Sequence, residues 1–214
     1  MIKKIIAFDC DSTLSAIEGV DELARLAGSE IFQQVQDLTN QAMDGKIAIE
    51  EVFGRRLDLI RPSREQCEQI GLMYLEQIEP TAKKTIEALH QDGWECLILS
   101  GGFTPCIQAL AKSLGIEHIE AVPIHFDTDG SYLGFDQDYP TTRNGGKPEI
   151  LADLKSTLSP DRLIMVGDGV SDLETTPIVD QFIAFTRYAA RPKVTEQCLF
   201  EAQELSDLID LIKD

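Results

Sequence analysis

The chain has 214 residues, 43% of them hydrophobic, so it can bury a substantial core as one large domain or one domain with an insert. Its formal net charge of -18 argues against nucleic acid and anionic membranes as partners. Because we find no secretory leader and no apolar run of about 20 residues, we expect a cytoplasmic protein without a membrane anchor. The five cysteines are scattered, so their spacing predicts neither a disulfide framework nor a zinc site.

A short apolar run, Ile5–Phe8, predicts a buried strand that ends at two carboxylates, Asp9 and Asp11. Functional residues of parallel sheets lie just past the carboxyl ends of the strands, so we expect the two acids to share a pocket. They repel each other unless a cation, hydrogen bonds or a shared proton relieves the charge. The pair therefore indicates a metal, acid–base chemistry or both, although a simple turn rich in Asp, Ser and Thr would use the same residues.

The segment after this strand has only helical signals. Apolar residues recur at helical spacing between residues 15 and 78, and Ser63 with Gln66 fits a capping box that opens another helix. The segment leaves and re-enters beside the first strand's loop. We therefore predict a helical cap domain over residues 15–78 on an α/β core formed by residues 1–14 and 79–214.

The next part of the chain alternates helices and strands. A helix is expected from about Thr81 to His90, followed by a strand at Cys96–Leu99 that runs into the Ser100–Gly102 loop. Thr104 and Pro105 are suited to the N-cap and first turn of a helix that reaches about Leu114, where Gly115 stops it.

A β-hairpin and another helix are expected next. Residues 122–126 and 132–135, joined by a turn containing Gly130, predict a small β-hairpin. Pro148 opens a helix to about Leu158, just after Lys147.

Three more elements complete the predicted fold. The Leu163–Val166 strand leads into Gly167, Asp168 and Gly169, and another strand is expected at Phe182–Phe185. A C-terminal helix is expected at about 202–212. The alternation predicts a doubly wound, Rossmann-like parallel sheet with helices on both faces.

Residues from the loops after successive strands, together with a lysine at a helix start, should gather at one end of this sheet. They are Asp9, Asp11, Ser100, Gly101, Gly102, Lys147, Asp168 and Asp172. Asp9, Asp168 and a loop carbonyl could bind Mg²⁺, whose preferred ligands are hard oxygens. The serine hydroxyl and glycine N–H groups could hold a phosphate, and Lys147 could offset its charge. Each motif alone is common in loops, but together and in this order they indicate phosphoryl transfer.

These residues resemble the haloacid dehalogenase superfamily and, within it, the phosphoserine phosphatases, over nearly the whole chain. The first family motif, D-x-D-x-T, stands at residues 9–13. Ser100 and Lys147 match the second and third motifs, and residues 167–172, G-D-G-V-S-D, match the fourth. The resemblance implies a Mg²⁺-dependent phosphatase that releases L-serine from O-phospho-L-serine, a reaction of serine biosynthesis.

The resemblance also implies residues that bind the substrate. Glu18 matches the glutamate that meets the substrate ammonium, Arg56 a carboxylate-binding arginine, and Met43 a lining methionine. Ser171 stands where the family often has asparagine and keeps a polar hydroxyl. Ile49 replaces a common phenylalanine, so we expect either a cap that packs less closely or a compensating bulky neighbour such as Phe53. Taken without the family pattern, Glu18 would be a helix-terminal charge and Arg56 a solvated arginine.

The family mechanism implies that Asp9 attacks phosphorus and forms an aspartyl-phosphate, which water then cleaves. Asp11 would act first as the acid and then as the base. Asp9, the backbone carbonyl of Asp11 and Asp168 would bind Mg²⁺. Asp172 would hold a water molecule bound to the metal, or it would orient Lys147.

Two alternatives stay open at this stage. A phosphatase of another small phosphomonoester would use the same core, because the cap selects the leaving group. A signalling receiver also carries an acidic pair and a lysine on a doubly wound sheet, but its phosphorylated aspartate would fall where this chain is helical. The oligomeric state does not follow from the sequence.

Overall fold

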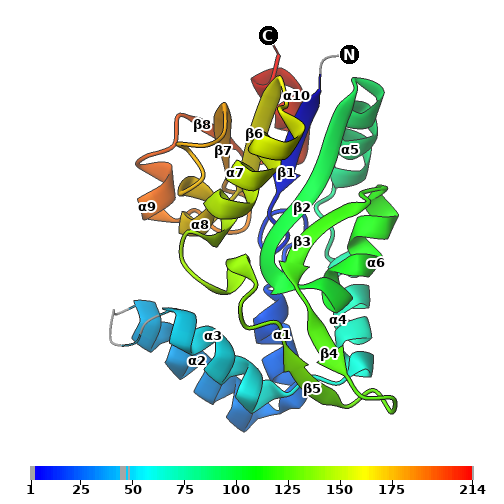
Figure 1. Ribbon diagram of the computed structural model, residues 1–214, viewed down its shortest axis with the longest axis vertical. Helices are drawn as coiled ribbons and strands as arrows, with labels where there is room; N and C mark the ends of the chain where they lie inside the picture. The colour runs from blue at the N-terminus through cyan, green and yellow to red at the C-terminus, as the bar shows by residue number, and fades with distance from the viewer. Residues whose placement is uncertain (1–2, 44–46, 48, 214) are drawn as a thin grey trace.

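The computed structural model describes residues 3–43, 47 and 49–213, without the side chains of residues 42, 43, 49 and 50. Its centre is a six-stranded parallel sheet in the order β3-β2-β1-β6-β7-β8 (Figure 1). The six strands are β1 Lys4–Phe8, β2 Trp94–Phe103, β3 His118–Val122, β6 Arg162–Gly167, β7 Gln181–Phe185 and β8 Phe200–Ala202.

The strand order reverses direction at β1. From β1 the chain builds β2 and β3 on one side and later β6, β7 and β8 on the other. Ligands of open α/β sheets bind at such a switch point, outside the carboxyl ends of the strands. Asp9 follows the last residue of β1, so the fold places it at this point.

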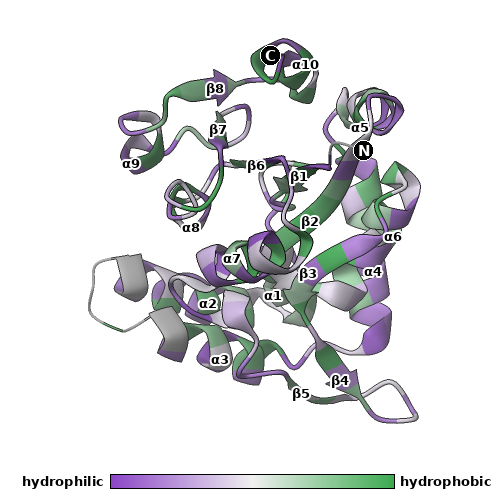
Figure 2. Ribbon diagram, turned by 45° about the horizontal axis from the view of Figure 1, so that its top comes forward, coloured by the Kyte–Doolittle hydropathy of each residue, from purple (hydrophilic) through white to green (hydrophobic). Residues whose placement is uncertain are grey.

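Both faces of the sheet are buried because its strands are apolar at consecutive positions rather than at alternate ones. In β1, Ile6 and Phe8 face one apolar cluster, and Ile5 and Ala7 face the other. Figure 2 shows the long central strand β2 as predominantly hydrophobic. Six helices accompany the sheet within the described chain: α5 Ala82–Gln91, α6 Thr104–Leu114, α7 Gly146–Leu158, α8 Val170–Leu173, α9 Pro192–Thr195 and α10 Leu208–Leu211.

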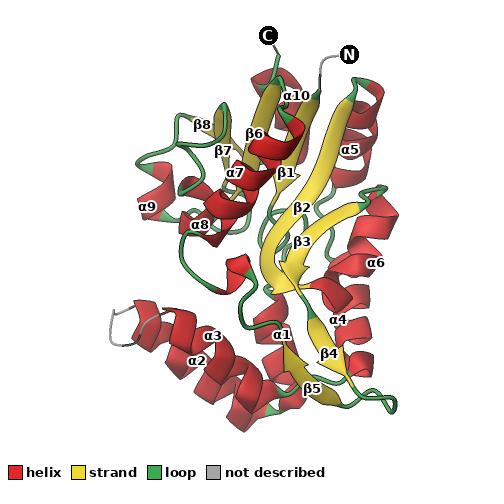
Figure 3. Ribbon diagram, in the orientation of Figure 1, coloured by secondary structure: helices red, strands yellow, loops and turns green. Residues whose placement is uncertain are grey.

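The inserted segment is helical, as the sequence predicts. It comprises α1 Gly19–Ala27, α2 Ser29–Met43, α3 Ile49–Ile60 and α4 Arg64–Glu76. Ser63 and Gln66 form the predicted capping box of α4. Ser15 and Ile78 pair at an isolated bridge, so the segment leaves and returns side by side. In Figure 3, α1, α2 and α3 lie beyond the end of the sheet toward which β1 and β2 point, whereas α4 lies along α6.

The predicted hairpin is also present, as β4 Ile124–Phe126 paired antiparallel with β5 Tyr132–Phe135. Its first strand starts later than predicted, because Val122 ends β3, a parallel strand that the sequence patterns did not reveal. Gly130, at φ 86°, provides the left-handed turn residue.

The predicted C-terminal helix over 202–212 is wrong. Ala202 instead ends the edge strand β8, which pairs with β7, and a short 3₁₀ turn at Leu205–Asp207 precedes the four-residue helix α10. Leu205 and Leu208 are nevertheless buried. Their spacing suits either one long helix or two short turns, so sequence periodicity alone could not separate the two.

Element ends near the site also differ from prediction. Strand β2 continues through the expected Ser100–Gly102 loop to Phe103, with a shift of register after Leu99. The N-cap of α6 is Phe103 rather than the predicted Thr104, whose hydroxyl donates to the Ala121 carbonyl. Helix α7 begins at Gly146, which places Lys147 inside its first turn.

No helix among the described residues has the length and apolar character needed to cross a membrane.

Candidate active site

A buried lysine lies between two carboxylates at the carboxyl edge of the sheet. Lys147 Nζ is 2.6 Å from Asp172 Oδ1 and 3.1 Å from Asp9 Oδ1. Burial opposes the charge of Lys147, but the charges of Asp172 and Asp9 outweigh it and raise the lysine pKa. The side chain is therefore a fixed positive charge beside Asp9.

Three buried carboxylates could surround a cation. One oxygen of each of Asp9, Asp168 and Asp172 lies within 4.8 Å of the others. Both oxygens of Asp172 are already engaged, one by Lys147 and the other by the Gly169 N–H at 2.9 Å. Asp9 and Asp168 are therefore the better direct ligands, and their hard oxygens fit a cation such as Mg²⁺.

The charge balance of this cluster also favours a cation. Burial and the neighbouring charge of Asp9 raise the pKa of Asp168 to about 7, while Arg191 opposes the shift. Buried carboxylates are normally paired or coordinate metals. Asp9 accepts a 2.7 Å hydrogen bond from the Cys10 N–H on the oxygen nearest to Lys147.

Asp11 is held from the helical insert. Its Oδ1 accepts hydrogen bonds from the Tyr74 hydroxyl, on α4, and from the Gly19 N–H at 3.1 Å, at the start of α1. A Cβ atom at Gly19 would lie 2.1 Å from the Tyr74 hydroxyl oxygen, so the contact requires glycine there. Burial, followed by the charges of Glu18 and Asp9, raises the pKa of Asp11, which favours a carboxyl group that can donate a proton.

The end of β2 is tightly packed around Ser100. The buried Ser100 hydroxyl oxygen accepts a 3.0 Å hydrogen bond from the Gly102 N–H. A Cβ atom at Gly102 would lie 3.2 Å from Ser100 Oγ and 3.5 Å from Asp11 Oδ2. The second motif and Asp11 thus share one small space. Gly101 faces the 3₁₀ turn at residues 140–142, since its Cβ would lie 3.7 Å from the Thr141 carbonyl oxygen.

Glu18 faces the same acidic site from the insert. It accepts a 2.7 Å hydrogen bond from the hydroxyl of Ser12, a buried residue in the left-handed region at φ 51°. It also lies beside Arg191, whose Nη2 is 3.4 Å from Glu18 Oε1. Burial raises the pKa of Glu18, while the Ser12 hydrogen bond and the charge of Arg191 act against the rise.

Arg56, on α3, carries a buried Nε without a hydrogen-bond acceptor among the described residues. Burial lowers its pKa, and the charges of Asp21, Glu18 and Asp11 oppose that shift. The guanidinium thus stands near the acidic side chains with donor capacity still unused.

Three other residues singled out from the sequence remain: Ser171, Met43 and Ile49. Ser171 is exposed, with its hydroxyl oxygen 3.5 Å from the position of a Cβ on Gly169. The side chains of Met43 and Ile49 lie outside the described residues, so their roles stay predictions.

Three contacts of the site, made by Ser12, Tyr74 and Arg191, were not predicted from the sequence. Tyr74 and Arg191 lie outside the sequence motifs. Their partners lie 63 and 23 residues away for Tyr74–Asp11 and Arg191–Asp168. Only Ser12, inside the first motif, carried a local signal.

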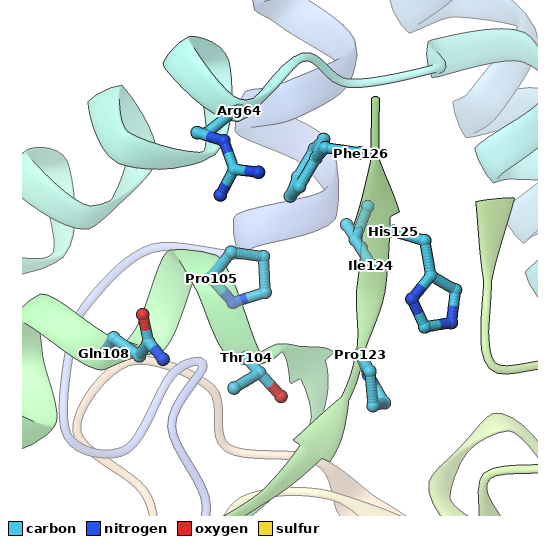
Figure 4. A pocket seen from close by; sticks show the side chains of 8 residues that line it. All are labelled: Arg64, Thr104, Pro105, Gln108, Pro123, Ile124, His125 and Phe126. Atoms are coloured by element: carbon cyan, nitrogen blue, oxygen red, sulfur yellow. The ribbon is translucent and has the colours of Figure 1, made fainter. Parts of the chain in front are cut away.

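A separate pocket of about 340 Å³ opens beside the start of α6 (Figure 4). It is lined by Arg64, Thr104, Pro105, Gln108, Pro123, Ile124, His125 and Phe126. None of the predicted site residues lines it, so the candidate site is defined by the carboxylate cluster instead.

The family model of the haloacid dehalogenase-like hydrolases matches residues 3–175 of this chain. The fold and the acid–lysine cluster agree with this class of hydrolase. Among curated relatives, the phosphoserine phosphatase of Bos taurus is 31% identical over 98% of this chain and 93% of its own. That of Methanocaldococcus jannaschii is 30% identical over 99% of this chain and 98% of its own.

Solved structures agree with these relatives. A phospho-aspartyl intermediate analogue of a phosphoserine phosphatase superposes with a TM-score of 0.82 and 28% identity, covering 100% of both chains. The chain belongs to the haloacid dehalogenase-like hydrolases and, within them, to the phosphoserine phosphatase family. It is therefore a phosphatase, and the receiver alternative has no support.

We predict that Tyr74→Phe lowers kcat about tenfold while the protein stays folded. The substitution removes one hydroxyl that positions Asp11, and loss of a typical hydrogen bond costs about 1 kcal/mol of stability. Steady-state phosphate release and thermal unfolding would measure the two effects. Tyr132→Phe, which removes the hydroxyl of another buried tyrosine in β5, is the matched control. An unchanged kcat in Tyr74→Phe would contradict the positioning role.

Proposed function

We propose that this chain hydrolyses O-phospho-L-serine to L-serine and phosphate, with Asp9 as the nucleophile. The observation that carries the choice of substrate is Arg56, whose buried Nε has no acceptor among the described residues while Glu18 lies nearby. A cation and an anion at one site match the carboxylate and ammonium of an amino acid. The names of the relatives point to the same substrate.

The proposed cofactor is Mg²⁺, held by Asp9, Asp168 and the backbone carbonyl of Asp11, with Asp172 in support. When bound, Mg²⁺ would neutralise phosphoryl oxygens and so make phosphorus easier to attack. Lys147 adds a second positive charge to the same region, because its Nζ already lies 3.1 Å from Asp9.

In the first chemical step, a carboxylate oxygen of Asp9 forms a bond to phosphorus as the bond from phosphorus to the serine oxygen breaks. Both hydrogen bonds that the described residues make to Asp9 use Oδ1, so Oδ2 is the oxygen available for attack. Asp11 gives its proton to the departing serine oxygen. Its burial beside Glu18 and Asp9 supports this acid role.

In the second step, water cleaves the aspartyl-phosphate. Asp11, now ionised, takes a proton from the water as the water oxygen bonds to phosphorus, and the bond to Asp9 breaks. This restores both carboxyl groups. Tyr74 and Gly19 keep Asp11 oriented through both steps because they bind the oxygen Oδ1.

Substrate recognition falls mainly to the proposed cap, residues 15–78. Glu18 would bind the ammonium, Arg56 the carboxylate, and Met43 would line the pocket. Ser100, Gly101, Gly102 and Ser171 would contact the phosphoryl end. Movement of the cap would admit the substrate and then exclude bulk water during transfer.

Asp9→Asn should lower phosphate release by about 10⁴-fold or more, because an amide is isosteric with the carboxylate but cannot act as the nucleophile. Phosphate release from phosphoserine and circular dichroism would test activity and folding, with mass spectrometry to check for deamidation. Asp58→Asn, at an exposed carboxylate of α3, is the control. Near-normal turnover in a folded Asp9→Asn protein would rule out the covalent route.

Asp11→Asn should reduce phosphoserine turnover by about 10²- to 10⁴-fold, the usual range for a lost general acid. Formation of the phosphoenzyme from p-nitrophenyl phosphate should suffer less, since p-nitrophenolate leaves without protonation. A pre-steady-state burst of p-nitrophenolate separates the two steps. If Asp11→Asn slowed phosphoenzyme formation equally from phosphoserine and from p-nitrophenyl phosphate, Asp11 would not be the acid.

Arg56→Ala should weaken phosphoserine far more than phosphoethanolamine, which lacks the carboxylate. Loss of one partner from a desolvated charge pair often costs about 2 to 5 kcal/mol. The ratio of kcat/KM values for the two substrates measures this selectivity. Arg55→Ala, which removes an exposed neighbour paired with Glu51 at 3.3 Å, should leave the ratio unchanged. Equal losses on both substrates would refute the carboxylate role.

A further inference from the structure

Arg191 joins the two halves of the candidate site. Its Nε donates a 2.8 Å hydrogen bond to Asp168 Oδ2, and its Nη2 lies 3.4 Å from Glu18 Oε1. Asp168 follows β6 in the sheet, whereas Glu18 precedes α1 in the inserted helices. One guanidinium therefore holds the proposed metal ligand and the proposed ammonium-binding group at the same time.

The segment that carries Arg191 is anchored elsewhere. Arg187, four residues earlier, pairs with Glu204 at 3.2 Å and with buried Glu79 at 3.8 Å. Val194, three residues later, is buried in the sheet's second apolar cluster. The Arg191 side chain itself is 42% exposed, so it has room to swing away while its backbone stays fixed.

A cation on Asp168 would disturb this arrangement. A guanidinium and a divalent ion on the same carboxylate repel each other at short range, more strongly in a partly buried site than in water. The more favourable arrangement separates the two charges. Once Arg191 leaves Asp168, it loses the shorter of its two contacts. The remaining contact with Glu18 then holds its side chain less firmly.

We propose that Arg191 is a positioning residue that couples metal binding at Asp168 to the availability of Glu18. Without the cation, Arg191 occupies both carboxylates; with it, Arg191 withdraws and leaves Glu18 free for the substrate ammonium. This inference rests on the proposed function, since it uses the metal role of Asp168 and the ammonium role of Glu18. It makes the metal and the amino acid bind cooperatively.

The first test is calorimetric titration of Mg²⁺ into wild type, Arg191→Gln and Lys193→Gln. Lys193→Gln removes an exposed positive charge from the same segment and controls for net charge. We expect Arg191→Gln to bind Mg²⁺ about tenfold more tightly than wild type, within the usual range of coupling effects. Lys193→Gln should bind as wild type does. Equal affinities in all three proteins would overturn the proposal.

The second test measures L-serine binding with and without Mg²⁺. L-serine has an ammonium but no phosphoryl group, so its dependence on the metal reports the state of Glu18. Mg²⁺ should tighten L-serine binding about fivefold or more in wild type and change it little in Arg191→Gln. An equal effect of Mg²⁺ in both proteins would overturn the coupling.

Two further variants separate the possible failures. Asp168→Asn should abolish Mg²⁺ binding; if it does not, the proposed metal site is wrong, whatever Arg191 does. If Asp168→Asn does abolish binding and Arg191→Gln has no effect, only the coupling is wrong. Arg191→Lys keeps the charge but cannot span two carboxylates, so it should lose the coupling while staying folded if Arg191→Gln is unstable.

Discussion

The site depends on compensation of the negative charge of five acidic side chains that lie together at one edge of the sheet. They are Asp9, Asp11, Glu18, Asp168 and Asp172. Lys147 compensates two of these charges, because its buried ammonium lies between Asp9 and Asp172. Removing either acid would leave a buried charge with less compensation, which is costly in a protein interior. Lys147, in the first turn of α7, thus allows carboxylates to follow both β1 and β6.

Close approach of backbone and side chain imposes a second constraint. A Cβ atom on Gly167 would lie 2.3 Å from the Asp172 carboxylate carbon, and one on Gly19 would overlap the Tyr74 hydroxyl. These glycines are needed for space rather than for an unusual backbone angle. They let the acids come near the ends of the strands, where Lys147 can reach them.

The inserted helices do more than cover the site. Asp11 belongs to the loop after β1, yet its hydrogen bonds come from Gly19 on α1 and Tyr74 on α4. Arg56 adds, from α3, a buried Nε that has no hydrogen-bond acceptor among the described residues. The proposed acid and the proposed substrate contacts are therefore held by the same helices. In this arrangement, recognition of the leaving group and its protonation depend on one structural unit.

The sequence by itself determined the parallel sheet, the helical insert, the capping box at Ser63 and the identity of the chemical groups. It could do so because apolar runs, caps and motif residues are local signals. The short edge strands β3 and β8 were missed, because their pairing with longer strands supplies what their own few residues cannot. The expected C-terminal helix was wrong because the spacing of its apolar residues suits two short turns as well as one long helix.

Tertiary structure alone decided how the charged groups are paired. Tyr74 reaches Asp11, and Arg191 reaches both Asp168 and Glu18, across 63, 23 and 173 residues of sequence. No local pattern records such contacts, since a tyrosine on an apolar helix face and an arginine in a loop are common features. The energy of a buried charge depends on its neighbours in space, and only the packed sheet and helices bring those neighbours together.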